Sequence, residues 1–353
     1  MAGDTTIQVA LIGFGLGGRS FHAPLIAITP GMRLHTIVTS DAERQRAALA
    51  EYPGTRIVPT ADAMFAHSAD VDLVVVSTPN RTHVPLASAA IAAGKAVVVD
   101  KPIARTSAEA TQLIAEAKAR GVFLSAYQNR RWDGDFLTLR GLIASDALGR
   151  VHRFESRLDR WRPAAKGGWR ERGDAAEAGG LLYDLGSHLI DQALTLFGPA
   201  DDVYAELDVR RPGVEADDDV FVAIEHRSGV RSHLWATVMA AQSGPRFRVL
   251  GNKAAFTKSG SDVQEEALRN GQRPGGAEWG VEPRERWGRL GTDAESTPVP
   301  TERGMYQEYY AGVVRSLRDG APPPVDPADS VAMLDVIERA RQERQERQER
   351  KQS

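Results

Sequence analysis

Short apolar runs alternate with more polar stretches through the first 126 residues of the chain. Runs of roughly four to eight apolar residues are typical of buried strands, and the stretches between them have the length of helices. Buried strands joined by helices form parallel sheets covered on both faces, so we predict a doubly wound α/β domain. Its strands are expected at residues 7–12, 33–39, 56–58, 71–77, 96–99 and 122–126, and its helices at 41–50, 61–67, 84–93 and from 107 onward.

The pattern changes in the second half, where apolar and polar residues alternate one by one. Val220, Val222 and Ile224 lie on one side of such a strand, which indicates a sheet covered on a single face. We predict an open, mostly antiparallel sheet with helices on that face and an uncovered face that pairs subunits. Strands are expected at 151–161, 203–209, 220–225, 231–239, 246–250 and 254–258, helices at 127–144, 181–197, 305–318 and 327–344, and loop at 259–300.

These patterns and the length of 353 residues, which exceeds one typical core, predict two domains. Residues 1–126 form the first, and residues 127–340 form a substrate and oligomerisation domain whose closing helices return to the junction. Residues 341–353 are expected to be a charged, frayed tail in which a Gln-Glu-Arg triplet repeats, and we assign this tail no function.

A glycine-rich loop follows the first strand. Gly13, Gly15 and Gly18 match the G-x-G-x-x-G pattern, and Phe14 occupies its second position. Such glycines permit a tight turn, close approach of backbone to a pyrophosphate and close helix–strand packing, while the helix N-terminus offers unbonded N–H groups. The position between a first strand and a helix favours dinucleotide binding over a purely structural turn.

The end of the second strand indicates which dinucleotide binds. An acidic residue there would contact the ribose 2′-hydroxyl of NAD, but this chain has Thr39 and Ser40. Arg44 lies one helical turn further on and supplies positive charge for a 2′-phosphate. We interpret Asp41 as the N-cap of the following helix. The sequence therefore favours NADP and leaves NAD as the other choice.

Polar segments follow the later strands of the first domain at their carboxyl ends, where open α/β sheets bind ligands. Lys101, between Asp100 and Pro102, lies where a buried strand ends, and His83 begins a helix as a structural or cofactor-adjacent residue. The segment after the fourth strand suits either a lining beneath a flat cofactor ring or a simple turn. It comprises Ser77, Thr78, Pro79 and Asn80, and Asn129 joins the expected cofactor contacts.

The helix expected at 181–197 has a polar stripe that contains Asp184, His188, Asp191 and Thr195. A solvent-facing stripe is one explanation, but Gly186 lies within the helix at a cost of ~1 kcal/mol relative to Ala, which suggests close approach of another group. A metal ion shared by Asp184 and His188 lacks a supporting ligand pattern, so we expect no metal. We favour an acid–base pair, in which a neutral imidazole accepts a hydroxyl proton and the carboxylate orients it.

Aromatic and basic residues after the sixth strand are candidate substrate contacts, because Arg can hydrogen-bond to a ring-shaped ligand and Trp can stack on it. They are Tyr127, Arg131, Arg157, Trp161 and Trp169.

Composition removes several classes of function. The net charge of −3 shows no basic excess, so nucleic acid and anionic membranes are not expected partners. The chain contains no cysteine, which excludes disulfides and thiol chemistry. No apolar run reaches the ~20 residues of a membrane span, and the N-terminus lacks a signal-peptide pattern. We expect a cytoplasmic protein.

These residues together resemble the glucose-fructose oxidoreductase / inositol dehydrogenase (Gfo/Idh/MocA) family over about residues 7–340. The matching elements come in order: the loop at 13–18, the segments at 77–80 and 100–102, and the segment 179–188 with Asp191. Glu is usual in the family where this chain has Asp100. The segments at 21–26, 129–136 and 159–163 are similar to the branch that contains NADP-dependent scyllo-inositol dehydrogenases.

The resemblance implies a Rossmann domain followed by an open β-sheet domain, with Lys101, Asp184 and His188 as the catalytic trio. It also implies a cis Lys101–Pro102 bond, a homodimer or homotetramer formed through the sheet face, and hydride transfer between NAD(P) and a secondary hydroxyl of a cyclic polyol or sugar. A non-catalytic NADP-binding sensor and a reductase of imine or unsaturated substrates remain alternatives. Whether Lys101 or His188 is the primary proton acceptor also stays open.

Overall fold

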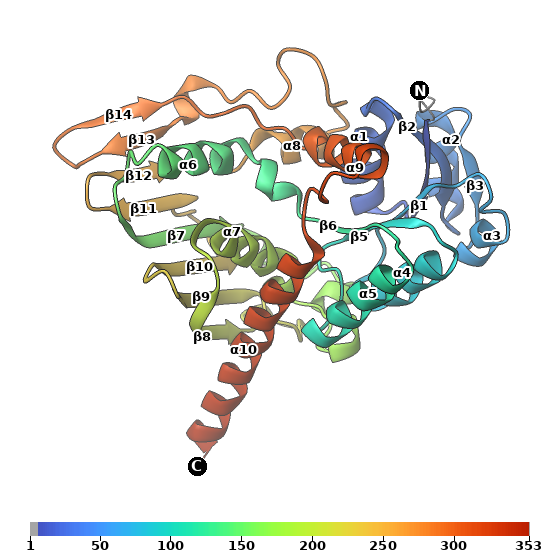
Figure 1. Cartoon of the computed structure of the whole chain (residues 1–353). Helices are drawn as coiled ribbons and strands as arrows, with labels where there is room; N and C mark the ends of the chain where they lie inside the picture. Colours follow the sequence, from blue (N-terminus) through green and yellow to red (C-terminus); the bar gives the residue numbers. More distant parts are fainter. Residues whose placement is uncertain (1–5, 353) are drawn as a thin grey trace. The chain divides into compact units, whose positions relative to one another are not determined.

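The computed structural model describes residues 6–352, which form two compact units (Figure 1). The first unit contains the residues up to Asn129 together with Gln264–Trp279 and Met305–Ser330. The second contains Arg130–Val263, Gly280–Gly304 and the residues from Val331 onward. The first boundary lies close to the expected residue 126, but the two later segments of the first unit were expected in the second domain.

The first unit is built on a six-stranded parallel sheet in the order β3-β2-β1-β4-β5-β6. Its central strands are buried on both faces because both faces carry helices, and Val74, Val75 and Val98 have no exposed surface. The strands are β1 (Ile7–Ile12), β2 (Met32–Val38), β3 (Arg56–Val58), β4 (Leu73–Val76), β5 (Ala96–Asp100) and β6 (Leu124–Tyr127).

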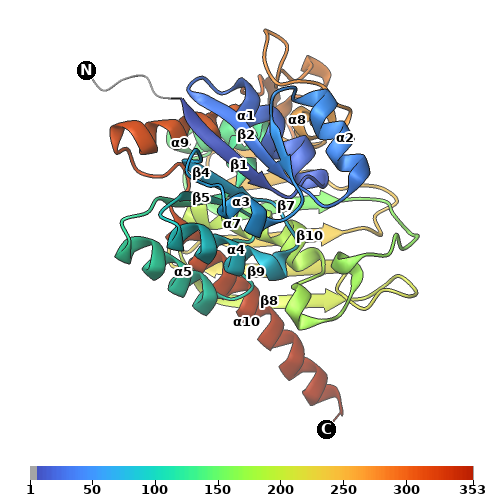
Figure 2. The same ribbon diagram turned by 90° about the vertical axis from the view of Figure 1, so that its right-hand side faces the viewer.

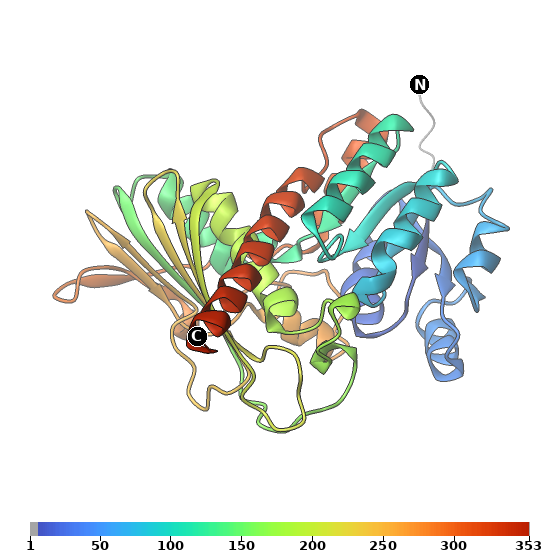
Figure 3. The same ribbon diagram turned by 90° about the horizontal axis from the view of Figure 1, so that it is seen from below.

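Right-handed crossovers place α1 and α2 on one face of this sheet and α4 and α5 on the other (Figures 2 and 3). The later helix α9 packs against α1. The helices are α1 (Ala23–Ile28), α2 (Ala42–Glu51), α3 (Ala61–Phe65), α4 (His83–Ala92), α5 (Ser107–Ala119), α8 (Val263–Arg269) and α9 (Gln307–Asp319), with short turns η1 (Gly17–His22) and η2 (Asn80–Thr82). The predicted doubly wound sheet is confirmed.

The second unit is built on an eight-stranded sheet in the order β14-β13-β12-β11-β7-β10-β9-β8. All neighbouring pairs are antiparallel except β7 and β10, which are parallel. The strands are β7 (Val151–Asp159), β8 (Ala200–Asp208), β9 (Asp219–His226), β10 (Arg231–Thr237), β11 (Phe247–Gly251), β12 (Ala255–Lys258), β13 (Gly288–Gly291) and β14 (Ser296–Val299).

Helices cover one face of this sheet, and no helix of the described residues covers the other (Figure 3). Val220, Val222 and Ile224 are buried beneath the helices, whereas Phe221 and Trp235 lie partly exposed on the opposite face. The predicted open sheet is therefore confirmed. The helical elements are η3 (Asn129–Trp132), α6 (Gly134–Ala144), η4 (Trp169–Glu171), η5 (Ala175–Glu177), η6 (Leu182–Gly186), α7 (Ser187–Phe197), η7 (Arg284–Arg286) and α10 (Pro327–Gln352).

Residues 259–300 are mostly loop, as expected, but the elements α8, β13 and β14 within this segment were not predicted. Glycine in β13 and proline in β14 made these strands hard to recognise in the sequence. A Cβ on Gly288 would lie 2.5 Å from the ring of Phe256, so the strand needs glycine there to pass this ring. Pro298 lies in β14, an edge strand that tolerates the missing N–H.

The last helix continues to Gln352, through the segment expected to be a frayed tail. Arg339 and Arg347 of α10 donate hydrogen bonds to the carbonyl oxygens of Asp201 and Ala205, on the edge strand β8. The guanidinium of Arg347 also lies 4.5 Å from the ring of Tyr204. These contacts hold the helix in place and occupy carbonyl groups that an edge strand would leave unpaired.

Candidate active site

The glycine-rich loop after β1 has the steric properties that a phosphate cradle requires. A Cβ on Gly13, whose φ is +100°, would lie 2.1 Å from Ser77 O, and a Cβ on Gly18 would lie 2.0 Å from Gly13 O. Neither position accepts a side chain. Gly15 is different, because only the Arg44 guanidinium comes within 4 Å of its Cβ position. The backbone at Gly15 is therefore open to a ligand.

The helix after this loop starts with a π-helical turn, η1, and Leu16 before it gives no side-chain cap. The first N–H groups thus point out of a helix N-terminus, where anions are favoured. Phe14, the second residue of the motif, is buried and packs edge-on to Tyr52 with ring centroids 6.3 Å apart. Phe14 contributes its backbone to the cradle while its side chain belongs to the core.

Positive charge lies beside the cradle. Thr39 and Ser40 follow β2, and the Asp41 carboxylate accepts the backbone N–H of Arg44 at 2.9 Å, which confirms Asp41 as an N-cap. The Arg44 guanidinium Nη1 lies 3.8 Å from the Cβ position of Gly15. Arg44 therefore extends from the start of α2 towards the loop.

Lys101 follows directly on β5, in a turn that Asp100 organises. The Asp100 carboxylate accepts the Lys101 backbone N–H at 2.8 Å through Oδ1 and the Ser77 hydroxyl at 3.1 Å through Oδ2. A Cβ on Gly17 would lie 3.0 Å from the same Oδ2. The ends of β4 and β5 and the start of the first helix thus meet at Asp100. The Lys101–Pro102 bond is cis, as the resemblance implied.

His83 ties this turn to the preceding polar segment. Its buried ring places Nδ1 2.7 Å from Pro102 O and Nε2 2.8 Å from Thr78 O. Burial lowers the pKa of His83, against the opposing influence of the Asp100 charge and the two carbonyls. Asn80 and Asn129 are also buried in the first unit. The segment 77–80 is therefore linked to the Lys101 turn and is more than an isolated surface turn.

Asp184 and His188 lie on one continuous helical element of the second unit. The expected single α-helix proves to begin with the π-helical turn η6, which contains Asp184, and to continue as α7, which contains His188. His188 is 6% exposed and Asp191 is 3% exposed, so the middle of the polar stripe faces the interior. Asp184 at its start is half-buried, and Thr195 at its end is exposed. Local π-helical turns are frequent at functional sites.

Gly186 was expected to permit the approach of another group. A Cβ there would lie 3.1 Å from Leu182 Cδ1, so the approaching group belongs to the same helical element.

Arg170, which the sequence analysis did not single out, contacts Asp184. Its Nε lies 3.4 Å from Asp184 Oδ1, its carbonyl accepts the Gly180 N–H at 2.8 Å, and its guanidinium stacks 4.4 Å from the Trp169 ring. The loop that contains Trp169 therefore lies beside Asp184. The sequence feature that could have indicated Arg170 was its position next to Trp169 in a loop rich in Gly and Arg.

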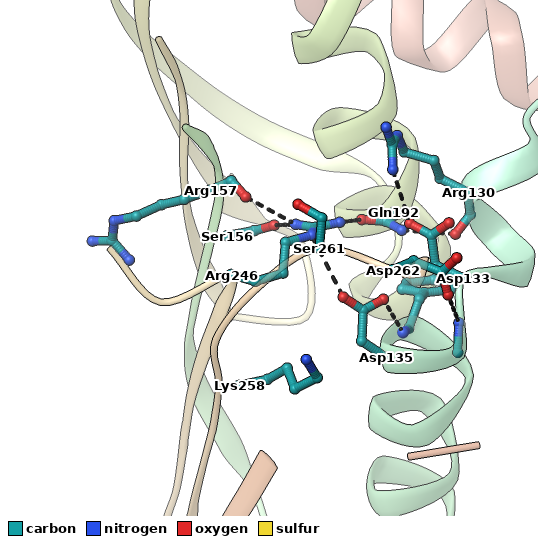
Figure 4. A network of polar contacts seen from close by, with 12 residues as sticks. Arg130, Asp133, Asp135, Ser156, Arg157, Gln192, Arg246, Lys258, Ser261 and Asp262 are labelled. Atoms are coloured by element: carbon teal, nitrogen blue, oxygen red, sulfur yellow. Dashed lines mark hydrogen bonds and ion pairs between the residues drawn. The ribbon is translucent and has the colours of Figure 1, made fainter. Parts of the chain in front are cut away.

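A buried polar network holds α7 against the sheet (Figure 4). Arg246 donates to Gln192 Oε1 at 2.7 Å and to the Ser156 hydroxyl, and its Nε lies 3.7 Å from Asp135 Oδ2. Gln192, which lies on α7 one turn after His188, donates to Arg130 O at 2.8 Å. Burial raises the pKa of the neighbouring Asp133 well above its usual range, although the Arg130 guanidinium 3.2 Å away opposes this shift. The network fixes the helix that contains His188.

The expected substrate contacts differ in their surroundings. Tyr127 is 2% exposed and its hydroxyl donates to Phe21 O at 2.8 Å, which places the ring in the core. Arg157 stacks 3.9 Å from the Trp235 ring on the uncovered face of the sheet, opposite α7, because neighbouring Ser156 points to the helices. Arg131 is bound by Asp191, and Trp161 is 56% exposed. We therefore leave Tyr127 and Arg157 out of the substrate site.

Metal and membrane features were searched over residues 6–352. No group of three or more His, Asp or Glu side chains in this range is arranged to hold a metal ion. No helix in the same range is both long and apolar enough to cross a membrane.

Comparison with family models gives two matches that together span most of the chain. Residues 7–128 match the model described as "Oxidoreductase family, NAD-binding Rossmann fold", and residues 140–351 match "Oxidoreductase family, C-terminal alpha/beta domain". Both are models of the Gfo/Idh/MocA group.

Relatives match over nearly the whole length. The chain is 41% identical over 336 residues to the uncharacterized oxidoreductase YdgJ of Escherichia coli (strain K12), covering 94% of both chains. It is 35% identical over 339 residues to the scyllo-inositol 2-dehydrogenase (NADP(+)) IolW of Bacillus subtilis (strain 168), covering 95% of this chain and 93% of that one. Among solved structures, yvaA from Bacillus subtilis matches with a TM-score of 0.92 at 33% identity, covering 98% of both chains.

Proposed function

Because the chain belongs to the Gfo/Idh/MocA oxidoreductase family, with an NAD-binding Rossmann domain, we propose that it is an NADP-dependent dehydrogenase of a cyclic polyol or sugar. The proposed reaction transfers a hydride reversibly between the cofactor and a secondary hydroxyl carbon. One observation carries the proposal of catalysis: Asp184 and His188 lie together on an inward-facing helix, and Lys101 lies at the carboxyl end of a buried strand. A protein that only sensed NADP would not need these acid–base groups.

The cradle after β1 fits the pyrophosphate of the cofactor. Gly13 and Gly18 exclude side chains and Gly15 leaves its backbone open, as close approach of a phosphate requires. Thr39 and Ser40 present no carboxylate to repel a 2′-phosphate, and the Arg44 guanidinium supplies charge near Gly15. The NADP named for the relative IolW agrees with this preference. Ser77, Thr78, Pro79, Asn80, His83 and Asn129 complete the proposed cofactor set.

The bound nicotinamide supplies the hydride acceptor, and the protein moves the proton. In polyol oxidation His188 accepts the hydroxyl proton as the general base. The Lys101 ammonium stabilises the oxyanion that develops on the same oxygen. Asp184 orients the hydroxyl and the imidazole, and Arg170 limits the movement of the Asp184 carboxylate. Of the expected substrate contacts, Trp169, Trp161 and Arg131 remain our candidates for binding the substrate.

A panel of substrates tests the proposal. The panel holds scyllo-inositol, other inositols, aldoses, a cyclic imine and an enone, each assayed by NADPH absorbance with NADP or NAD present. We expect turnover of at least one cyclic polyol with NADP and little with NAD. NADPH binding without turnover of any compound would favour the sensor, and turnover of the imine or enone alone would favour the other reductase chemistry.

We propose that the uncovered sheet face pairs two copies of the chain, in a homodimer or a homotetramer. The Phe221 ring lies 5.0 Å from Trp235 and 6.3 Å from Tyr204, and Arg157 stacks on Trp235. Such a row of aromatic and cationic side chains on a partly exposed face is typical of an interface core. Glu155, between Arg157 and Arg248 on the same face, keeps the two guanidinium groups separated.

A further inference from the structure

A buried histidine at the end of η1 points towards the carboxylate that organises the Lys101 turn. His22 has no exposed surface, and its Nε2 lies 3.5 Å from Asp100 Oδ2. On the opposite side of the ring, Nδ1 lies 2.6 Å from the hydroxyl of Tyr310, a fully buried residue of α9. The three side chains form a chain from α9 through the first helix to the end of β5.

The charge on Asp100 depends on this neighbourhood. Burial alone would raise the pKa of Asp100, but the neighbouring side chains of His22, His83 and Lys101 outweigh it and lower the pKa to about 2. Asp100 is therefore ionised at neutral pH. Its two oxygens then accept from the Lys101 backbone and from Ser77, as described above, with His22 on the remaining side.

Packing alone does not account for an imidazole at this position. The His22 ring lies tilted against Tyr127 with centroids 4.2 Å apart and edge-on to Tyr310, contacts that a phenylalanine ring would make equally well. Burying a polar ring is costly unless its nitrogens find partners. Nδ1 of His22 finds such a partner in the Tyr310 hydroxyl, whereas Nε2 lies 3.5 Å from Asp100 Oδ2, within ion-pair distance but without a hydrogen bond. The imidazole therefore links Tyr310 to the Asp100 carboxylate, which a phenylalanine ring could not do.

The short side chain of Asp100 shows how this link acts on the Lys101 turn. The Asp100 carboxylate stays close to its own backbone and bonds the very next N–H, that of Lys101. A carboxylate held so close to the turn transmits its position directly to the Lys101 backbone. Any group that fixes Asp100 therefore also fixes the direction in which Lys101 leaves the strand.

We propose that His22 and Tyr310 are positioning residues that hold Asp100, and through it the Lys101 backbone, in the geometry that directs the lysine side chain. This inference rests on the proposed function for its catalytic meaning. His83 holds the same turn from its other side, through the Pro102 carbonyl. Asp100, Tyr127 and Tyr310 contact His22 directly, while Lys101 and His83 lie near Asp100, and Tyr309 lies against Tyr127 and Tyr310.

Substitutions of His22 separate positioning from packing. His22→Phe keeps the ring volume and removes both polar contacts, while His22→Gln keeps an amide that can reach towards Asp100. Tyr310→Phe removes a single hydroxyl and serves where His22→Phe does not fold. Folding of each variant is checked by circular dichroism and thermal melting.

The first readout needs no substrate. The rate at which acetic anhydride labels Lys101 is measured by mass spectrometry relative to Lys118, an exposed lysine on α5. We expect labelling of Lys101 to rise at least threefold in His22→Phe and in Tyr310→Phe, and to return towards the wild-type ratio in His22→Gln. An unchanged ratio in folded His22→Phe and Tyr310→Phe would overturn the inference.

The second readout separates the inference from the proposed function. With scyllo-inositol and NADP, we expect His22→Phe to lower kcat at least tenfold, to leave the Kd for NADPH within twofold and to be partly rescued by His22→Gln. Wild-type kcat in His22→Phe, measured where Lys101→Ala is inactive, would overturn the positioning role and leave the proposed function intact. A Lys101→Ala enzyme as active as wild type would overturn the proposed function itself, whatever the labelling shows.

Discussion

Arg131 and Asp191 form a two-bond ion pair in the second unit. Arg131 Nε lies 2.8 Å from Asp191 Oδ2, and Nη2 lies 2.6 Å from Oδ1. The pair joins the segment after β6 to α7, the helix that contains His188. Arg131 therefore has a structural partner in addition to the substrate role expected for it.

Replacing Arg131 by Ala should leave the buried Asp191 carboxylate without its two donors. Removing one partner of a buried pair costs about 3 kcal/mol or more, so we expect a loss of this size in the free energy of unfolding. Urea denaturation followed by circular dichroism measures it. The double variant Arg131→Met/Asp191→Leu should recover most of the loss. Unchanged stability with a raised KM would instead make Arg131 purely a substrate contact.

Arg44 should determine the preference for NADP. We expect Arg44→Ala to raise the Kd for NADPH at least about tenfold, or about 1.4 kcal/mol, because a charge-assisted contact to the 2′-phosphate is lost. The Kd for NADH should hardly change. Arg46→Ala, at an exposed position two residues on, is the matched control. Equal losses for both cofactors, measured by NADPH and NADH fluorescence, would show that Arg44 does not read the 2′-phosphate.

His226 should make the stability of the second unit depend on pH. Its Nδ1 lies 2.7 Å from Gly198 O and its Nε2 lies 2.7 Å from the Ser232 hydroxyl, which suits a neutral ring that donates to the carbonyl and accepts from the hydroxyl. Burial lowers the pKa of His226 below its ordinary 6.5. The stabilisation is therefore complete above pH 6.5 and is lost as the pH falls below it.

Urea titrations between pH 7.5 and pH 5 test this sign. A single site changes the free energy of unfolding by at most about 1.4 kcal/mol per pH unit, and we expect His226 to lower it as the pH falls below 6.5. His226→Gln should make the profile less steep over this range. A profile in His226→Gln as steep as that of wild type would assign the acid sensitivity to other groups, among them His83, whose pKa is also lowered.

The arginines of α10 should protect the edge of the second sheet. Arg339 and Arg347 occupy carbonyls of β8, so the double variant Arg339→Ala/Arg347→Ala should lose about 1 kcal/mol per arginine and expose an edge that pairs with other chains. Light scattering during mild heating measures the resulting association. Arg350→Ala, which removes an ion pair with Glu343 on the same helix, is the control. Equal light scattering by the double variant and by Arg350→Ala would show that Arg339 and Arg347 do not protect the edge of the sheet.

Trp235 should be central to pairing of the uncovered sheet face. We expect Trp235→Glu to dissociate the oligomer into monomers in analytical ultracentrifugation, because a charge replaces the ring at the centre of the aromatic row. Trp235→Phe keeps an aromatic ring and should remain paired. A Trp235→Glu protein with wild-type mass would place the subunit contact elsewhere.

The first unit was predictable because its signals are local. Strands such as 96–99 are apolar throughout, and the glycine spacing at Gly13, Gly15 and Gly18 has a steric cause that the structure shows. The alternation at Val220, Val222 and Ile224 likewise revealed which face is buried. Patterns of this kind can be recognised in the sequence because their apolar residues repeat at one fixed period.

The contacts that arrange the candidate site were not predictable, because they join distant parts of the chain. His22 and Tyr310 are separated by 288 residues, and no period relates them. The π-turn that contains Asp184 spans five residues, too few for its wider period to be told from an α-helix. Beyond residue 340, α10 is held by contacts between its arginines and β8. The polar sequence of this segment does not reveal those contacts.

The central claim is that Lys101 and His188 perform proton and charge chemistry in NADP-dependent polyol oxidation. Its most direct test is kcat for the polyol identified by the substrate panel, measured for wild type, Lys101→Ala and His188→Ala alongside the Kd for NADPH. We expect kcat to fall by about 10²–10⁴-fold in each variant while the Kd changes less than about threefold. Wild-type kcat in both variants would contradict the account.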